Sequence, residues 1–225
     1  KNIDRSSGGR CPTRYTFNKA FFHVLSVFIG EGTVDFVLKD IFNHILFQEH
    51  THCQLDRQLE KRITEITQTY PVNCISIASS GVVQEDCFYN GHGAYMGKHE
   101  IAVNLKAQLD VPVVVENDVK SMMMGVQADN QYESLAYVYM SQTGVGSAYY
   151  LNQQILKGNQ AFSGELGLLP YQQQSINAAI ARQPSIAVLE DICVQLFMTI
   201  ALTIDPKQII VAGPRLSSLS LSHIK

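Results

Sequence analysis

Asn117 and Asp118 are the residues of this sequence best placed to do chemistry, in the stretch "VPVVVEND" that precedes "VKSMMMGVQAD". The valine run predicts a buried strand and the following segment predicts a helix, so both polar residues stand at a strand–helix junction. An aspartate there can accept a proton as a general base, and the neighbouring amide can hydrogen-bond a hydroxyl group. The same position equally suits a residue that caps the helix, and the local pattern leaves both interpretations open.

Two glycine-bearing turns follow within "YMSQTGVGSAYYLNQQILKGNQAFSGELGLL". In "TGVGS", Thr143, Gly144 and Gly146 form a turn whose backbone N–H groups could approach a phosphate. In "SGELG", Glu165 sits between two glycines, where a carboxylate can accept two hydroxyls of a sugar ring. Each pattern is also common in ordinary turns, so neither identifies a site by itself.

Composition limits the possible classes of protein. The chain has 225 residues and a net charge of −3, which fits two modest lobes and argues against nonspecific nucleic-acid binding by this segment. We find no apolar run that suggests a membrane span, and we expect a cytoplasmic protein without membrane partners. The cysteines are Cys11, Cys53, Cys74, Cys87 and Cys193. Their odd number and the lack of a CxxC pair predict no disulfide framework and no structural zinc site.

The order of the predicted elements indicates two similar α/β lobes. A three-strand meander over residues 23–50 precedes a helix over 54–70, in which Leu55, Leu59, Ile63 and Ile66 form one apolar stripe. The later elements are a strand at 74–81, a helix at 100–109, a strand at 111–118, a helix at 118–129, a hairpin over 134–154, a helix at 189–204 and a strand at 208–213. We assign residues 1–20 to a linker arm, 21–116 to the first lobe and 117–225 to a second lobe that is incomplete at its C-terminus.

Taken in order, these pieces resemble the ROK family of bacterial sugar kinases and sugar-responsive transcriptional repressors. The matching segments are "ISIASSGVV", "VPVVVENDVKSMMMGVQ", "SQTGVGSAYYLNQQILKGNQAFSGELG" and "IDPKQIIVAGPRLS". The resemblance spans residues 21–218 and implies a two-lobed, actin-like ATPase fold with the sugar between the lobes. It also implies a homodimer or a higher homo-oligomer.

The resemblance assigns a role to each candidate residue. Asp118 matches the catalytic base of the family's kinases, and Asn117 matches its hydroxyl-binding partner. Glu165 matches the sugar-binding glutamate, and Gly81 lines the same pocket. The second phosphate turn of the family corresponds to Thr143, Gly144 and Gly146.

Several positions depart from the kinase pattern. Phe28 stands where kinases of the family have a phosphate-site aspartate, and Glu31 would bring negative charge toward the phosphates, although Thr33 could reach one. Leu168 replaces a histidine of the family's zinc site, and residues 171–185 contain no cysteine. These departures predict a chain that binds no cofactor and no metal, zinc included, and whose phosphate turn is vestigial.

The first residues favour the repressor branch. "GGRCPTRYTFN" is similar to the link that joins a DNA-binding domain to the effector lobes in ROK repressors, although a disordered tail is the simpler interpretation. We expect a sugar-binding effector and dimerisation region with no enzymatic activity, which binds a sugar or sugar phosphate and reaches DNA through a domain preceding this segment. One alternative is an ATP-dependent sugar kinase that uses Asp118, ATP and magnesium. The other is a scaffold lobe that binds no sugar.

Overall fold

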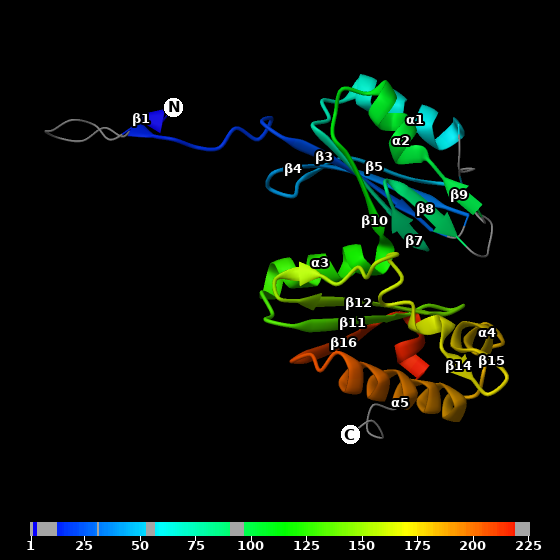
Figure 1. The fold of residues 1–225 in the computed structure, drawn as a ribbon. Coiled ribbons are helices and arrows are strands. Elements are labelled where there is room, and N and C mark those ends of the chain that lie inside the picture. The colour runs from blue at the N-terminus through cyan, green and yellow to red at the C-terminus, as the bar shows by residue number, and fades with distance from the viewer. Residues whose placement is uncertain (1, 4–12, 31, 53–56, 91–96, 219–225) are drawn as a thin grey trace, which may run out of the picture. The chain divides into compact units, whose positions relative to one another are not determined.

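The structure, a computed structural model, describes residues 2–3, 13–30, 32–52, 57–90 and 97–218. The chain forms two compact units, one made of residues 1–78 and 92–115 and the other of residues 79–91 and 116–225 (Figure 1). Residues 79–91, which the sequence assigns to the first lobe, lie in the second unit. All the candidate sugar and phosphate residues therefore belong to one unit, because Gly81 joins the residues after position 116.

The first unit is built on a five-stranded sheet in the order β10-β6-β3-β4-β5. The strands are β3 (His23–Ile29), β4 (Val34–Asp40), β5 (Ile45–Thr51), β6 (Cys74–Ser79) and β10 (Val113–Asn117). Successive antiparallel pairing of β3 with β4 and of β4 with β5 confirms the predicted meander. Alternate residues of β3 and β4 are buried, as expected for strands with one face on a core.

Two helices belong to this unit. Helix α1 (Arg57–Thr69) buries Leu59, Ile63 and Ile66, which confirms the predicted stripe, while Leu55 lies outside the described residues. Helix α2 (Ile101–Gln108) buries a short apolar face of its own. The amide of Asn104 on α2 donates to the carboxylate of Glu60 on α1 at 2.7 Å, so the two helices are joined at their polar faces.

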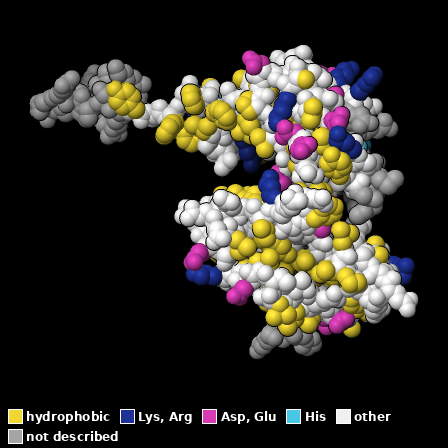
Figure 2. All heavy atoms as spheres, viewed as in Figure 1, with side chains coloured by type: hydrophobic (Ala, Val, Ile, Leu, Met, Phe, Trp, Pro, Cys, Tyr) yellow, Lys and Arg dark blue, Asp and Glu magenta, His cyan; other side chains and the backbone are white. Residues whose placement is uncertain are grey.

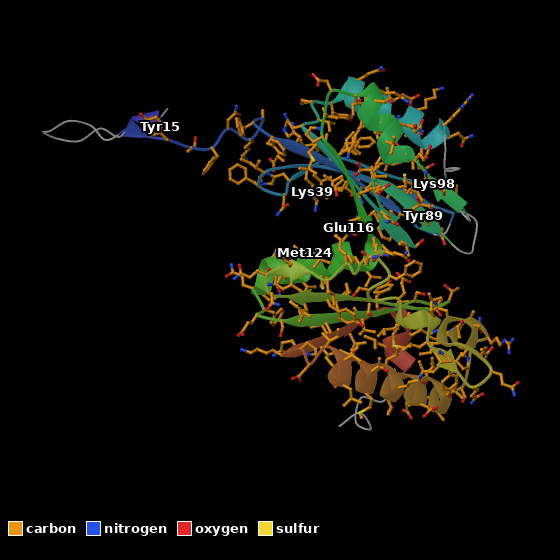
Figure 3. The ribbon with its side chains drawn as sticks, in the orientation of Figure 1. Tyr15, Lys39, Tyr89, Lys98, Glu116 and Met124 are labelled. Carbon is orange, nitrogen blue, oxygen red and sulfur yellow. The ribbon has the colours of Figure 1, made fainter. Side chains whose placement is uncertain are left out.

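An exposed apolar patch lies where the arm enters this unit. The arm contains the paired strands β1 (Asn2–Ile3) and β2 (Thr13–Arg14). Figure 2 shows hydrophobic side chains gathered beyond it. The exposed members are Phe17, Phe21, Phe22, Ile41, Phe42, Ile45 and Leu46, whereas Tyr15 lies at the far end of the arm (Figure 3). Because His23 at the start of β3 pairs with Asp40 at the end of β4, the arm residues and the β4–β5 turn lie at the same end of the sheet.

The second unit is built on a four-stranded sheet in the order β13-β12-β11-β16. Strands β11 (Leu135–Met140) and β12 (Val145–Leu151) form the predicted antiparallel hairpin, β13 (Gln154–Ile155) continues it, and β16 (Gln208–Ala212) runs parallel to β11. Helix α3 (Asp118–Asn130) packs Val119 and Met123 on one face of this sheet. Helices α4 (Ile176–Ala181) and α5 (Ile186–Thr203) pack on the other face.

Helix α5 corrects one expectation from the sequence. It is 18 residues long with a mean hydropathy of 1.8, so the chain does contain a helix long and apolar enough to cross a membrane. In the structure its inner face packs in the core of the second unit. The buried residues of that face are Leu189, Ile192, Cys193, Leu196 and Ile200. A core helix can meet the same length and composition criteria as a membrane span, but only 28% of this helix is buried, and Val194, Met198 and Leu202 are exposed.

Short elements complete the description. Strands β7 (Val82–Gln84) and β8 (Cys87–Asn90) form a hairpin in the second unit, and β9 (Gly97–His99) follows in the first. The 3₁₀ helix η1 (Leu166–Leu168) is followed by the paired strands β14 (Pro170–Tyr171) and β15 (Gln174–Ser175). A second 3₁₀ helix, η2 (Pro214–Ser218), follows β16. The β7–β8 hairpin and η1 matter most, because they carry residues next to the candidate site.

Candidate sugar site

Asn117 ends β10 and caps helix α3. Its Oδ1 accepts a hydrogen bond from the backbone N–H of Lys120 at 3.0 Å, and its own backbone is extended as a capping residue requires. Its Nδ2 donates to the carbonyl of Gly81 at 2.9 Å, and the side chain is buried. The capping interpretation is therefore confirmed. Because the amide oxygen keeps a second lone pair, capping leaves it able to accept a hydrogen bond from a ligand hydroxyl.

Gly81 lies beside Asn117 because its backbone makes a tight turn between β6 and β7. Its φ is +95°, and a Cβ atom there would come within 2.3 Å of the carbonyl oxygen of Tyr89. A side chain is thus excluded by both conformation and space. The structure brings together two residues, Gly81 and Asn117, that are far apart in the sequence and that the resemblance places in one pocket.

Asp118 is the first residue of α3 and is partly buried. Burial raises the pKa of its carboxyl group, while a hydrogen bond from the Val119 backbone N–H, at 2.8 Å to Oδ1, partly opposes that rise. A carboxylate whose pKa is raised is a stronger proton acceptor once ionised, and it can also accept hydrogen bonds from ligand hydroxyls. Both proposed roles therefore remain chemically open to Asp118.

Glu165 is the last residue of a loop, residues 156–165, that connects β13 to η1. The backbone of Glu165 is held at both sides, since its N–H donates to the Phe162 carbonyl at 3.1 Å and its carbonyl accepts from Leu168 N–H at 3.1 Å. The preceding residue, Gly164, is fixed to β12, where its carbonyl accepts from both the N–H and the hydroxyl of Ser147. The half-buried Glu165 carboxylate therefore projects from an anchored turn.

Two lysines join this loop to the start of α3. Lys157 Nζ lies 2.5 Å from Glu116 Oε2, and Figure 3 labels Glu116 at the junction of β10 and α3. Lys120 Nζ donates to the carbonyl of Ala161 at 3.1 Å. Burial lowers the pKa of the Lys120 ammonium, whereas the nearby carboxylates of Glu116 and Glu165 raise it. The segments that carry Asp118 and Glu165 are thus bonded to each other.

The predicted phosphate turn is closed by the protein's own side chains. The hydroxyl of Ser141 accepts from Thr143 N–H at 3.2 Å and from Gly144 N–H at 3.0 Å. The next N–H, on Val145, donates to Asn177 Oδ1 at 2.8 Å. An anion needs these donors, so it would have to displace Ser141 and Asn177 to bind here.

The glycines of this turn are closely packed. A Cβ on Gly144 would lie 2.5 Å from Asn177 Oδ1, and one on Gly146 would lie 2.8 Å from Val119 Cγ2 on α3. Asn177 also approaches Gly167, where a Cβ would come within 2.1 Å of its Oδ1. The small residues at 144 and 146 therefore have a structural explanation that does not involve phosphate.

The other kinase positions lie in the first unit. Phe28 is on β3 opposite Asp35, and Gly30 N–H donates to the Thr33 carbonyl at 2.9 Å in the β3–β4 turn. Glu31 lies outside the described residues. No carboxylate therefore occupies position 28 at the end of this strand.

Metal ligands do not gather in the described part of the chain. No group of three or more histidine, cysteine, aspartate or glutamate side chains lies close enough there to hold an ion. Leu168, which stands at the position of the family's zinc histidine, is an exposed residue of η1.

Reasoning from the sequence missed the roles of Lys120 and Asn177, although each residue carried a signal. A signal was present for Lys120, because a lysine in the first turn of a helix opposes the helix dipole and calls for an explanation. Asn177 is a polar residue in a short helix whose neighbours Ile176, Ala179 and Ile180 are buried, which also hints at a specific contact.

A family model described as "ROK family" matches residues 24–182. The chain is a member of the ROK family. Its relatives include the xylose repressor of Bacillus subtilis (strain 168), which is 24% identical over 179 residues. That match covers 72% of this chain but 46% of the repressor, so the chain spans about half the length of the curated relatives it matches.

Solved structures of the family share the fold. A ROK family protein from Streptococcus pneumoniae TIGR4 in complex with sucrose has a TM-score of 0.69 at 18% identity, covering 86% of this chain and 81% of that one. A ROK hexokinase from Thermus thermophilus has a TM-score of 0.67 at 15% identity, with 89% and 85% covered. A ROK family transcriptional regulator, a homologue of the E. coli MLC protein, has a TM-score of 0.62 at 17% identity, with 80% and 51% covered. The expected α/β, actin-like ATPase fold is thereby confirmed.

Proposed function

We propose that this chain is the sugar-binding effector and dimerisation region of a cytoplasmic ROK-type transcriptional regulator that lacks kinase activity. The main support is a contrast within one unit. The N–H groups of Thr143, Gly144 and Val145 are bonded to protein oxygens, whereas Asp118 and Glu165 lie on segments held close by side-chain bonds. The unit favours hydroxyl recognition over phosphate recognition.

The proposed ligand class follows from the chemistry of the candidate residues. Ionised carboxylates only accept hydrogen bonds, and an asparagine amide both donates and accepts. Asp118, Glu165 and Asn117 together suit the alternating donors and acceptors of a polyhydroxylated ring. We therefore propose a sugar, or a sugar phosphate whose phosphate lies away from these carboxylates, as the effector.

Regulation requires a difference in affinity between two conformations. A sugar that binds one arrangement of the two units more tightly shifts the population toward it, and a ligand with equal affinity for both shifts nothing. In the proposed dimer, such a shift would change the spacing of DNA-binding domains attached before residue 1. The similarity to a xylose repressor and to a ROK transcriptional regulator supports this class of function.

The first test is a thermal-shift panel of hexoses, pentoses, amino sugars and their phosphates, with and without magnesium ATP. We expect one sugar class to raise the melting temperature and ATP to leave it unchanged. Glu165→Gln should abolish that rise, while Lys207→Met, which removes an exposed lysine paired with Glu133, should preserve it. A panel in which no sugar raises the melting temperature would exclude the effector role and favour the scaffold alternative.

A second test uses the full-length protein and its operator DNA. The sugar that stabilises the protein should change operator affinity, and Glu165→Gln should make operator binding insensitive to that sugar. A sugar that binds without altering operator affinity would contradict the regulatory function but not the sugar site.

An ATP-dependent sugar kinase remains the second candidate because of Asp118. Its partly buried carboxyl group has a raised pKa, which suits a general base. On this alternative, ATP should stabilise the protein only with magnesium, and the protein should phosphorylate the sugar it binds. Asp118→Asn should then abolish phosphorylation while the fold persists. Phosphorylation that survives this substitution would exclude Asp118 as the base.

A further inference from the structure

We propose that Lys120 is a positioning residue that fixes the 156–165 loop to the start of helix α3 and so holds Glu165 in place for sugar binding. The part of this proposal that concerns sugar rests on the proposed function above. The part that concerns the loop can be measured without any ligand.

The burial of Lys120 calls for an explanation. Its side chain is 2% exposed, although lysine is seldom fully buried unless its ammonium group is paired. Taking an ammonium out of water is costly, and its place in the first turn of α3 is also unfavourable to the helix dipole. Specific contacts must therefore offset these costs.

Those contacts come from the loop. Nζ donates to the carbonyl of Ala161 at 3.1 Å, and Ala161 itself is buried with a left-handed backbone, φ +59°. A left-handed conformation is unfavourable for alanine, so the surrounding contacts must hold this residue in place. The carboxylate of Glu165, at the end of the same loop, also interacts electrostatically with the ammonium.

The other attachments of the loop lie near its ends. Lys157 pairs with Glu116 near the beginning, and Gly164 accepts two hydrogen bonds from Ser147 near the end. Lys120 adds a bond to the middle of the loop, from the helix whose first residue is Asp118. It therefore couples the two carboxylates through a single side chain, which makes it a positioning residue and not a direct sugar ligand.

The test compares Lys120→Met with the wild type by hydrogen–deuterium exchange in the absence of sugar. The reporters are the N–H groups of Ser163 and Glu165, which bond to Lys157 and Phe162 carbonyls within the loop. Because hydrogen bonds to charged groups are stronger than neutral ones, we expect exchange in the loop to be about tenfold faster in the variant. Exchange in β11 and β12 should stay unchanged. Lys207→Met, the exposed control, should alter neither.

Sugar binding gives the second readout. Lys120→Met should weaken the affinity for the stabilising sugar about tenfold, while Lys120→Arg, which keeps the charge and the donor, should restore part of it. Loop exchange unchanged in Lys120→Met would overturn the proposal. If Lys120→Met does not fold, the shorter and uncharged Lys120→Gln takes its place, with the same expected and contrary results.

The two proposals fail in different ways. If the loop loosens in Lys120→Met but no sugar binds even the wild type, the sugar-binding function is wrong and the loop attachment stands. If sugars bind the wild type and the variant equally well while the loop loosens, the positioning role in sugar binding is overturned.

Discussion

Asn177 Oδ1 accepts a hydrogen bond from the backbone N–H of Val145 at 2.8 Å. The same side chain fills the space beside Gly144 and Gly167, where a Cβ atom would overlap it. One asparagine of helix α4 thus bonds to the turn of the β11–β12 hairpin and lies against the turn at η1. It also occupies a donor that a phosphate would need in a working kinase.

Replacing this asparagine should destabilise the second unit. Asn177→Ala leaves the buried N–H of Val145 without its acceptor and opens a gap between two glycines, so we expect a loss of about 1–3 kcal/mol in the free energy of unfolding. Urea denaturation followed by circular dichroism measures it. Asn130→Ala, at the exposed end of α3, removes an amide that bonds to a carbonyl one turn away and should cost much less. Equal effects of the two substitutions would contradict the bridging role of Asn177.

Substitutions of Asn117 can separate the contributions of its two hydrogen bonds to stability. Asn117→Asp keeps the oxygen that caps α3 but loses the N–H that reaches Gly81, whereas Asn117→Ala loses both. We expect Asn117→Ala to cost about 0.5–2 kcal/mol for the cap alone, with a further loss for the Gly81 bond. Thermal melts of both variants measure the difference.

The control for the cap is Ser185→Ala at the exposed start of α5, where the serine oxygen lies 3.5 Å from Val188 N. It should cost less than Asn117→Ala. If Asn117→Asp proves as stable as the wild type, the Gly81 hydrogen bond contributes nothing.

Local patterns predicted most of the elements. The valine run before Asn117 identified β10. The i, i+4 spacing of Leu59 and Ile63 identified α1, because the residues buried on one face of a helix recur with the helical period. The β7–β8 hairpin was missed, since its turn uses Glu85 and Asp86 at positive φ instead of the asparagine–glycine pair that signals such a turn.

The contacts within the candidate site were harder to predict. The types of Asn117, Asp118 and Glu165 indicated hydrogen bonding to hydroxyls, but no local pattern indicates that Asn177 would reach a turn 32 residues earlier. Lys120 likewise meets Ala161, which is 41 residues away. Such contacts depend on tertiary packing, so residue type and spacing alone cannot reveal them.

Substitutions at Gly158 and Gly164 in the same loop should separate the cost of backbone strain from the cost of a steric clash. Both have positive φ, but a Cβ on Gly164 would lie 2.0 Å from the Ser147 carbonyl oxygen, whereas the nearest atom to one on Gly158 is 3.4 Å away. Gly158→Ala should therefore cost only the backbone strain, about 1–2 kcal/mol. Gly164→Ala should cost about 3–5 kcal/mol, because strand β12 must also move. Denaturation curves of the two variants measure the difference in their free energies of unfolding. Equal losses would mean that the loop shifts at Gly164 without a cost and that strand β12 does not have to move.

We expect the ionised Asp118 carboxylate to destabilise the folded state and to contribute to ligand binding. Burial raises its pKa in the folded state above the unfolded value, so the unfolded chain loses this proton first as the pH rises, and ionisation then disfavours the folded state. Asp118→Asn removes that penalty, and we expect its melting temperature at pH 7 to exceed that of the wild type by roughly 2–4 °C. The gain should shrink as the pH falls and vanish below about pH 3, where the aspartate is protonated in both states. Asp129→Asn, at the exposed end of the same helix, controls for the loss of charge.

The sugar that stabilises the wild type should stabilise Asp118→Asn far less, because a neutral amide replaces the carboxylate acceptor. A variant that gains no stability at pH 7, or that binds the sugar as well as the wild type, would show that the buried carboxylate is not held there for the ligand.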